Sequence, residues 1–249
     1  MAATTAPQPA NPFIKHLASS SRKTRDRALL SLRTYLARNT PFTPLDLLKL
    51  WKGLYYSMWM SDKPLNQQRL VRDLADLVDV LRTEENVLGF LEAFWKTMAR
   101  EWGGIDALRM DKYLYLVRCY VGKGFERCGR EGWEGPFTER YLEVVEGTPL
   151  EPSDSKIPNG LRYHVIDVYV DELDKADGER SAPLGRMLGP LRRVQKEGFV
   201  KTVRKRAEEA LEDERIGDWK GEKAAQADEE GGEEEEEDGE GGEFGGFAD

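Results

Sequence analysis

The segment YYSMWMSDKPLNQQRLVRDLADLV, residues 55–78, decides the fold class, because it joins an aromatic cluster, a four-residue break and a strongly periodic run. After the break, apolar residues recur at steps of three and four, the spacing of one helix face. They are Leu70, Val71, Leu74, Leu77, Val78 and Leu81. Charged residues take the opposite face: Arg69, Arg72, Asp73, Asp76 and Asp79. The run is therefore predicted to be a helix that packs on one side only.

The aromatic half of the segment raises the choice between core packing and a docking surface. Trp51, Leu54, Tyr55 and Met58 fall on one helical stripe, which favours the core. The sequence SDKP, residues 61–64, is predicted to link two antiparallel helices, with Asp62 available as a helix cap. Trp59 lies off the stripe, so it is either an exposed anchor or a partly buried side chain at a helix end. Spacing alone leaves both interpretations open.

The same three- and four-residue spacing extends from Asn11 to about Arg215 and predicts an all-α protein. Caps and first-turn prolines or acids mark three helix starts, at Thr43-Pro44, at Asp62 to Pro64 and at Thr83-Glu84-Glu85. The predicted helices are 44–60, 64–82, 84–102, 105–121, a short one near 137–145, 159–173, 184–194 and 198–215. Short antiparallel links favour a HEAT- or armadillo-like stack, although no clean sequence period is present.

A polar stretch, 122–156, is predicted to interrupt this pattern. It begins with GKGFERCGREG, residues 122–132, whose glycines suggest a phosphate loop but lack the G-x-x-x-x-G-K-[ST] order. We interpret it as an ordinary loop. Cys119, on the central helix, and Cys128, in the loop, are predicted to be free thiols rather than metal ligands.

Charge divides the chain into a body and a tail. Residues 218–249 carry 14 acidic and 2 basic side chains, a net of −12, whereas the whole chain has −9, so the body holds about +3. We predict a flexible N-terminus at 1–10, an α-helical domain at 11–216 and a disordered acidic tail at 217–249. The tail could bind basic proteins or only keep the molecule soluble.

Several functional classes find no support. Two cysteines fit neither a disulfide framework nor a four-ligand zinc site and favour a reducing compartment. No apolar run approaches membrane-spanning length, and the N-terminus lacks the blocks of a signal peptide. His16 and His164 belong to no catalytic or metal pattern. We therefore predict a protein that is not an enzyme, with no cofactor, metal, small-molecule substrate or membrane partner.

Two basic segments are candidate phosphate contacts. Residues 15–38 hold seven basic side chains and one acidic, and residues 186–206 hold eight and one. The candidates are Arg22, Lys23, Arg25, Arg27, Arg33, Arg192, Arg193, Lys196, Lys201, Arg204 and Lys205. Such helices can equally be solvated or dock proteins. Candidates for partner docking are Trp59, Asp62, Lys63 and Pro64.

Three stretches together resemble the nucleolar ribosomal RNA processing protein 1 family: LWKGLYYSMWMSDKP (50–64), FWKTMAREWGGIDALRMDKYLYLVR (94–118) and IPNGLRYHVIDVYVDEL (157–173). The resemblance runs from about Asn11 to about Arg206. Its marker residues here are Trp59, Ser61, Asp62, Lys63, Pro64, Arg100, Trp102, Gly103, Gly104, Asp106, Asp111, Tyr163, His164 and Asp167. Family members often continue into a lysine-rich extension, whereas this chain stops soon after its acidic run.

The resemblance implies a non-enzymatic scaffold of the nucleus and nucleolus that acts in large-subunit (pre-60S) assembly and in processing of precursor ribosomal RNA. Its partners would be that RNA, other assembly factors and ribosomal proteins. The alternative is a protein-only adaptor, or a histone-chaperone-like module, whose acidic tail captures basic partners. These two hypotheses differ in whether the tail is needed for association.

Overall fold

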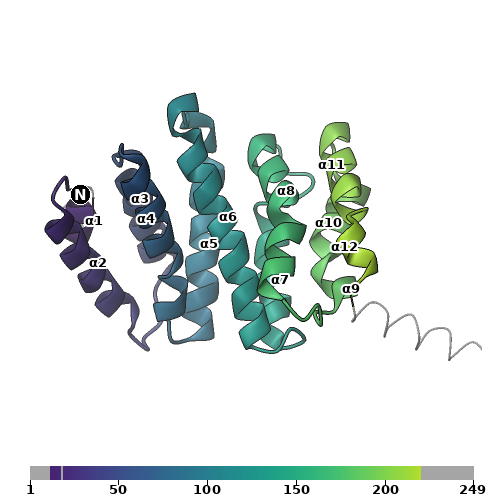
Figure 1. The fold of residues 1–249 in the computed structure, drawn as a ribbon, viewed down its shortest axis with the longest axis horizontal. Coiled ribbons are helices and arrows are strands. Elements are labelled where there is room, and N and C mark those ends of the chain that lie inside the picture. Colours follow the sequence, from purple (N-terminus) through teal and green to yellow (C-terminus); the bar gives the residue numbers. More distant parts are fainter. Residues whose placement is uncertain (1–11, 18, 220–249) are drawn as a thin grey trace, which may run out of the picture.

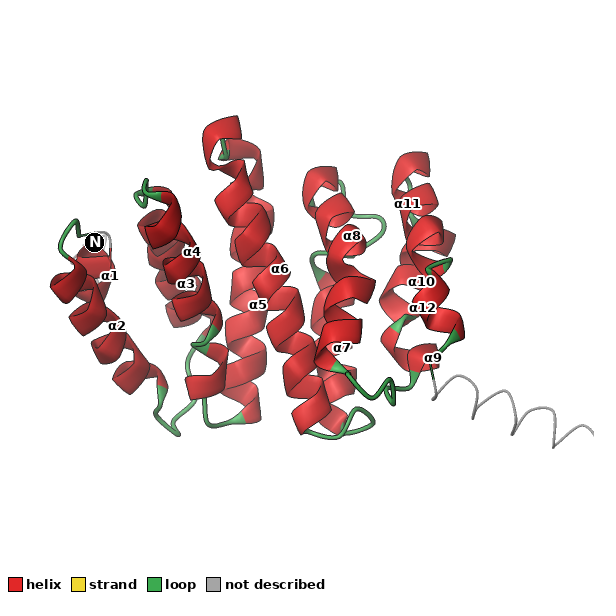
Figure 2. Ribbon diagram, viewed as in Figure 1, coloured by secondary structure: helices red, strands yellow, loops and turns green. Residues whose placement is uncertain are grey.

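The computed structural model describes residues 12–17 and 19–219, and within them every regular element is a helix (Figures 1 and 2). The α-helices are α1 Pro12–Leu17, α2 Arg22–Leu36, α3 Pro44–Trp59, α4 Pro64–Ala75, α5 Glu84–Glu101, α6 Ala107–Arg130, α7 Pro136–Gly147, α8 Asn159–Ala176, α9 Leu184–Met187, α10 Gly189–Glu197, α11 Lys201–Leu211 and α12 Glu214–Gly217. Two 3-10 turns are η1 Val78–Val80 and η2 Trp102–Gly104. The all-α prediction is confirmed.

The helices form two layers of a stack that is longer than it is deep (Figure 1). One layer is α1, α3, α5, α7 and α10, and the other is α4, α6, α8 and α11, each helix packing on the next in its layer. Each helix pair therefore touches mainly its neighbours in the stack, as in helical-repeat proteins.

Side-chain caps mark several of the helix starts. The Thr43 hydroxyl accepts from the Asp46 N–H at 3.2 Å, and the Thr83 hydroxyl accepts from the Asn86 N–H at 3.3 Å, so both predicted caps are confirmed. The cap predicted for Asp62 is wrong, because α4 begins after Lys63 with no side-chain cap. The helix that was predicted to reach residue 82 ends at Ala75, and the 3-10 turn η1 follows it. The apolar stripe of this segment is nevertheless buried throughout.

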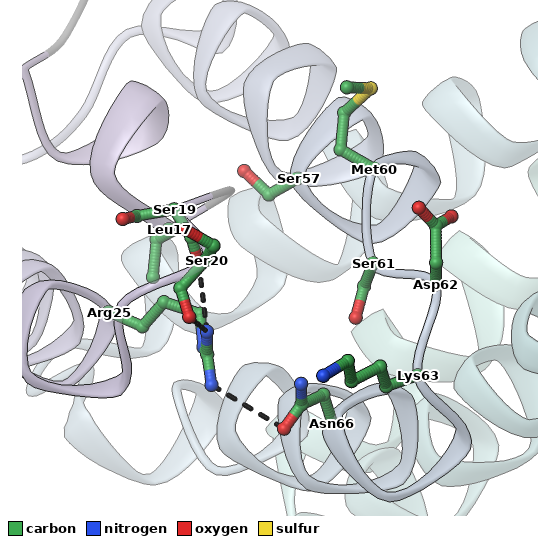
Figure 3. Close-up of a pocket in the computed structure, with 10 residues that line it drawn as sticks. All are labelled: Leu17, Ser19, Ser20, Arg25, Ser57, Met60, Ser61, Asp62, Lys63 and Asn66. Carbon is green, nitrogen blue, oxygen red and sulfur yellow. Dashed lines mark hydrogen bonds between the residues drawn. The ribbon is translucent and has the colours of Figure 1, made fainter.

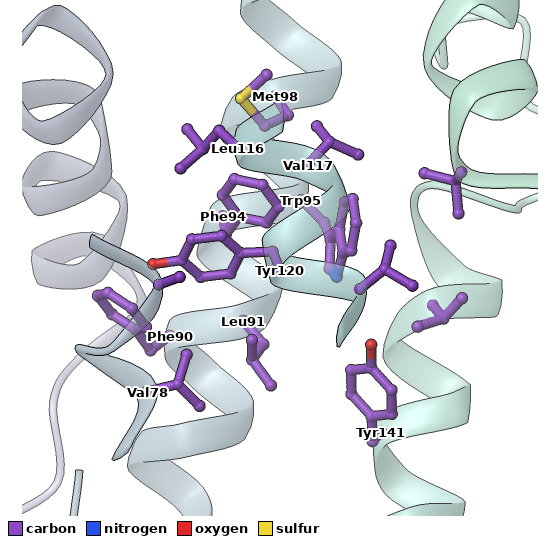
Figure 4. Packing of buried hydrophobic residues seen from close by; sticks show 14 of the residues in the cluster. Val78, Phe90, Leu91, Phe94, Trp95, Met98, Leu116, Val117, Tyr120 and Tyr141 are labelled. Atoms are coloured by element: carbon purple, nitrogen blue, oxygen red, sulfur yellow. The ribbon is translucent and has the colours of Figure 1, made fainter. Parts of the chain in front are cut away.

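The core runs along the seam between the layers. Trp51 is the centre of an aromatic cluster, with its ring 5.0 Å from Phe90, 4.9 Å from Phe94 and 5.1 Å from Tyr120, the last three seen in Figure 4. Its indole N–H donates to the Phe90 carbonyl at 2.9 Å, so the buried polar atom is satisfied. The stripe of Trp51, Leu54, Tyr55 and Met58 is core, as predicted.

The predicted loop 122–132 is wrong, because α6 continues to Arg130 through both of its first glycines. A Cβ on Gly124 would lie 2.0 Å from the Tyr141 ring of α7, and one on Gly122 would lie 2.6 Å from a Glu172 oxygen of α8. These glycines let neighbouring helices approach closely rather than ending the helix. Cys128 is consequently in the helix and buried, and both cysteines are free, as predicted.

The end of the described chain also departs from the sequence prediction. The segment 198–215 is a turn followed by α11 and the short α12 rather than one helix. Trp219 is fully buried, although composition suggested that nothing after residue 216 would be. Its indole N–H donates to Asp177 at 3.2 Å, and the Arg180 guanidinium lies 5.6 Å from its ring centre. Residues 1–11 and 220–249, with the predicted flexible ends, lie outside the described residues.

Ion pairs join α2 to α4, the segment from the end of α4 through η1 to α6, α6 to α8, and α8 to α11 and α12. This ion-pair ladder consists of Asp26–Arg69, Asp76–Lys123, Asp79–Lys123, Asp79–Arg130, Arg118–Asp171, Arg118–Glu172, Asp167–Arg206 and Asp171–Arg215. Burial alone would raise the pKa of Asp79, but hydrogen bonds from Lys123 and Arg130 hold it below its usual value. Much of the charge on the α4–α6–α8–α11 layer is therefore paired internally.

Candidate partner and nucleic-acid interface

The turn between α3 and α4 carries the predicted docking residues and is held rigidly from beneath. The Lys112 ammonium donates to the carbonyls of Trp59 and Ser61, both at 2.9 Å. The Gln67 amide donates to the same Ser61 carbonyl at 2.8 Å. Burial lowers the pKa of Lys112, and its nearly buried side chain still meets two acceptors. The backbone of the turn is therefore tied to both α4 and α6.

Trp59 is half-buried at the end of α3, which decides between the two interpretations left open by the sequence. The Arg109 guanidinium lies 4.7 Å from its ring centre, and Arg109 is paired with Asp106. Asp62, Lys63 and Pro64 are exposed beside it. Trp59 thus packs at the end of α3, and the exposed members of the predicted docking set are Asp62, Lys63 and Pro64.

A pocket of about 210 Å³ opens between this turn and the connection from α1 to α2 (Figure 3). Arg25 reaches into it and donates to the carbonyls of Ser19 at 2.8 Å and Ser20 at 2.9 Å, and to the Asn66 amide oxygen at 3.4 Å. Met60 stands at the pocket with 61% of its surface exposed. The structure thus brings the first basic segment and the SDKP turn together.

Within the first basic segment the candidate residues make different contacts. Arg25 holds backbone carbonyls, and Arg22 lies 3.6 Å from Asp26. Lys23 and Arg27 are exposed and Arg33 is half-buried. In the part of the chain that the structure describes, these last three have no carboxylate within 4 Å. They are the candidate phosphate contacts of α2 that have no internal ion pair in that part of the chain.

The second basic segment divides in the same way. Arg204 donates to the Gly198 carbonyl at 2.6 Å, and Arg192 donates to the Gly185 carbonyl at 2.9 Å. Arg193 forms ion pairs with Glu146 and Glu197, and Lys205 forms one with Glu209. Lys196 and Lys201 are exposed, with no ion pair among the described residues. Since α2 and α10–α11 lie at opposite ends of the stack (Figure 1), the two segments do not form one patch.

The remaining marker residues divide between internal contacts and exposed positions. Trp102 is buried, and Asp106 accepts from the Arg109 N–H at 3.1 Å as the cap of α6. The His164 ring contacts the Leu114 carbonyl at 2.8 Å. Tyr163 bonds Thr202, Asp167 pairs with Arg206, and Arg100 pairs with Glu101. Gly103, Gly104 and Asp111 are exposed.

Two residues that matter for the interface were missed by sequence reasoning. Lys112 lies beside Tyr113 on an apolar helix face and is buried. A lysine in an apolar stripe was the signal that its ammonium group would bind buried acceptors. Phe199 stands between Lys196 and Lys201 with 75% of its surface exposed. A lone phenylalanine amid basic residues was the signal there.

The described part of the chain holds neither a metal-binding cluster nor a cysteine of lowered pKa. No cluster of three or more histidine, cysteine or acidic side chains could hold a metal ion there. Burial raises the pKa of Cys128 to about 12 and also raises that of Cys119, which disfavours a reactive thiolate in either. The described helices also include none with the length and apolar character needed to cross a bilayer.

The fold defines a class of protein: a stack of α-helices in which each helix packs mainly on its neighbours, as in helical-repeat proteins. Within that class, the family model described as "Nucleolar protein, Nop52" matches residues 8–243, and the chain belongs to this family. The family resemblance and the nucleolar location predicted from the sequence are confirmed at the level of the family.

Curated relatives agree with this assignment. The chain is 43% identical over 172 residues to ribosomal RNA processing protein 1 homolog B of Homo sapiens, which is 67% of this chain and 23% of that protein. It is 43% identical over 166 residues to homolog A of Mus musculus, covering 65% and 33%. The Caenorhabditis elegans homolog is 33% identical over 169 residues, covering 67% and 42%. The chain thus spans less than half the length of these relatives.

Proposed function

We propose that this chain is a non-enzymatic scaffold that acts in the processing of precursor ribosomal RNA within precursors of the large ribosomal subunit. Its family and the names of its relatives support the process. In this proposal the stack contacts RNA at its two ends, and the α3–α4 turn contacts other assembly factors or ribosomal proteins. Other proteins then cleave and trim the RNA that this scaffold holds.

One observation carries the proposal: each end of the stack presents a group of cations that have no ion pair among the described residues. Lys23, Arg27 and Arg33 lie on α2, and Lys196 and Lys201 flank the α10–α11 turn. Between them, the ion-pair ladder occupies many of the basic side chains of its layer. Phosphate contacts depend on cations that are free to replace counterions. In this proposal the stack holds one long RNA at both ends, or bridges two RNA segments.

The test reverses charge where the structure leaves it free. Lys23→Glu with Arg27→Glu should shift the tagged protein from heavy to light sucrose-gradient fractions and weaken its crosslinks to ribosomal RNA. Arg25 is left unchanged, because its guanidinium holds the α1–α2 connection. The matched control is Lys49→Glu with Lys52→Glu, two exposed lysines of α3 outside both basic segments. Unchanged sedimentation and crosslinking of a folded Lys23/Arg27 variant would refute this contact.

A second variant separates the proposal from the protein-only adaptor that depends on the acidic tail. Deletion of residues 220–249 removes the acidic run at 228–243 and retains every described residue. The scaffold proposal expects the shortened protein to stay in heavy fractions with ribosomal RNA. Loss of association on this deletion, with the basic variants unaffected, would favour the adaptor.

A further inference from the structure

The α10–α11 turn exposes a large aromatic side chain in the middle of the second basic segment. Phe199 has 75% of its surface in contact with solvent, and the adjacent Val200 has 39%. A phenylalanine gains from burial, so a face this exposed is available to a partner at little desolvation penalty. The question is which kind of partner the surroundings of this ring favour.

The backbone that carries Phe199 is fixed on both sides. The Arg204 guanidinium donates to the Gly198 carbonyl at 2.6 Å and to the Phe199 carbonyl at 3.3 Å. The Phe199 N–H points to the Pro152 carbonyl at 3.4 Å, which ties the turn to the α7–α8 connection. A Cβ on Gly198 would lie 2.7 Å from the Val194 carbonyl oxygen, so glycine is required for this tight turn. The ring is therefore presented by an ordered backbone.

The α7–α8 connection beneath it is ordered in turn by a buried arginine. Arg162 is 4% exposed, and its guanidinium donates to the carbonyls of Glu151 and Asp154, both at 2.7 Å, and of Ile157 at 2.6 Å. Holding three carbonyls of one connection with one planar group fixes its path. Two connections of the stack thus form one rigid support for Phe199.

Charge around the ring favours a polyanion. Lys196 lies in the last turn of α10, three residues before Phe199, and Lys201 begins α11 two residues after it. Neither lysine has an acidic partner within 4 Å among the described residues. The carboxylate of Glu197 is already paired with Arg193 at 3.2 Å, and that of Asp154 accepts from the Lys156 N–H at 2.8 Å. The two lysines beside Phe199 in the sequence therefore have no ion pair within the described chain, whereas the neighbouring Glu197 is paired with Arg193.

We propose that Phe199 is a stacking platform for an unpaired base of RNA, with Lys196 and Lys201 on the flanking phosphates. An aromatic face between lysines is how proteins bind single strands without reading sequence. Bases inside a duplex are already stacked and cannot reach such a ring. This inference rests on the proposed RNA contact and adds that, at this end of the stack, the RNA is single-stranded.

The test measures fluorescence anisotropy of a labelled 12-nucleotide single-stranded RNA of mixed sequence, and of the matching duplex, with the purified full chain. Phe199→Ala should weaken single-strand binding roughly tenfold, the order expected from loss of one stacked base, and should leave duplex binding unchanged. Phe199→Trp should retain or strengthen single-strand binding. Lys196→Glu with Lys201→Glu should weaken binding and lower its dependence on salt.

Leu108→Ala is the matched control, because Leu108 is 94% exposed beside the paired Arg109 and far from these lysines in the sequence. It should bind RNA as the wild type does. If Phe199→Ala binds the single strand as the wild type does, or loses duplex binding equally, the stacking proposal is overturned. The proposal is also overturned if the Phe199→Ala protein binds RNA normally but no longer retains one of the proteins found in particles purified with the wild type. That result would make Phe199 an anchor for a protein.

Failure of the broader proposal looks different. A wild-type chain that binds neither RNA and is absent from ribosomal precursors would refute the proposed function together with this inference. A wild-type chain that joins those precursors but binds no single strand would refute the inference alone. A folded state is verified for each variant by its helical circular dichroism, which an exposed side chain should not change.

Discussion

Gly124→Ala should destabilise this protein, although the same change inside most helices is stabilising. Alanine gains about 1 kcal/mol over glycine from helix propensity alone. Here its Cβ would stand 2.0 Å from the Tyr141 ring, whereas carbon contacts need about 3.5 Å or more. Tyr141 cannot simply turn aside, because it is buried, its ring centre 6.1 Å from that of Phe125 and 6.4 Å from that of Phe137.

The magnitude follows from these two opposing effects. Overpacking of a dense core costs about 1–3 kcal/mol and sometimes more, and the displacement needed here is at the severe end. We expect a net loss of about 2 kcal/mol in the free energy of unfolding, or about 4–8 °C in Tm for a domain of this size. Urea unfolding followed by circular dichroism measures it.

Two companion variants make the reasoning refutable. Gly147→Ala, at the end of α7, places its Cβ where nothing lies within 4 Å and should change stability by less than about 0.5 kcal/mol. Tyr141→Leu makes room beside α6, so in the double variant the two losses should sum to less than their separate values. A Gly124→Ala protein as stable as the wild type, or strictly additive losses, would refute close α6–α7 contact as the reason for this glycine.

Two further predictions concern polar groups inside the stack. Asn86→Ala should lower the free energy of unfolding measured in urea by about 2 kcal/mol, because the Asn86 side chain accepts from the buried Phe42 N–H at 3.0 Å and donates to the Thr40 carbonyl at 3.2 Å. Asn86→Asp should lose at least as much, because its buried carboxylate keeps the acceptor but faces the Thr40 carbonyl without a proton to donate. Burial lowers the pKa of His164, partly offset by its bond to Leu114, so the unfolded chain takes up the proton first and stability should fall as pH drops below about 6.5. The unfolding free energy at pH 7.5 and 5.5 should differ less in His164→Gln, and an equal difference in both proteins would exclude His164 as the cause.

Helix periodicity was sufficient for the fold because it reports burial directly. The stripe from Leu70 to Leu81 is buried even though η1 interrupts the helix, since a 3-10 turn keeps apolar residues on the same side. Glycine misled the prediction at Gly122 and Gly124, because a glycine that ends a helix and one that admits a neighbouring helix look alike in a single sequence. Only the positions of Tyr141 and Glu172 distinguish them.

The candidate interface was less predictable, for a reason that Arg25 and Arg204 illustrate. Composition counts every arginine in a basic segment as a possible phosphate contact. Both of these guanidiniums instead hold carbonyls of connections, at Ser19 and at Gly198. Carbonyl positions depend on how the backbone turns between helices, which residue counts do not contain. The exposed Lys23 and Lys201 are indistinguishable from them in sequence.

The burial of Trp219 affects how the acidic tail can be studied. A deletion placed by composition would begin at Gly217 and would take the tryptophan away with the tail. It would leave the carboxylate of Asp177, which is 5% exposed, without its indole partner, and would uncover the apolar surface that the ring protects. Aggregation or weak partner binding of such a truncation would then be mistaken for a function of the acidic residues. A cut after Trp219 separates the two effects and gives a sound boundary for expressing the folded unit.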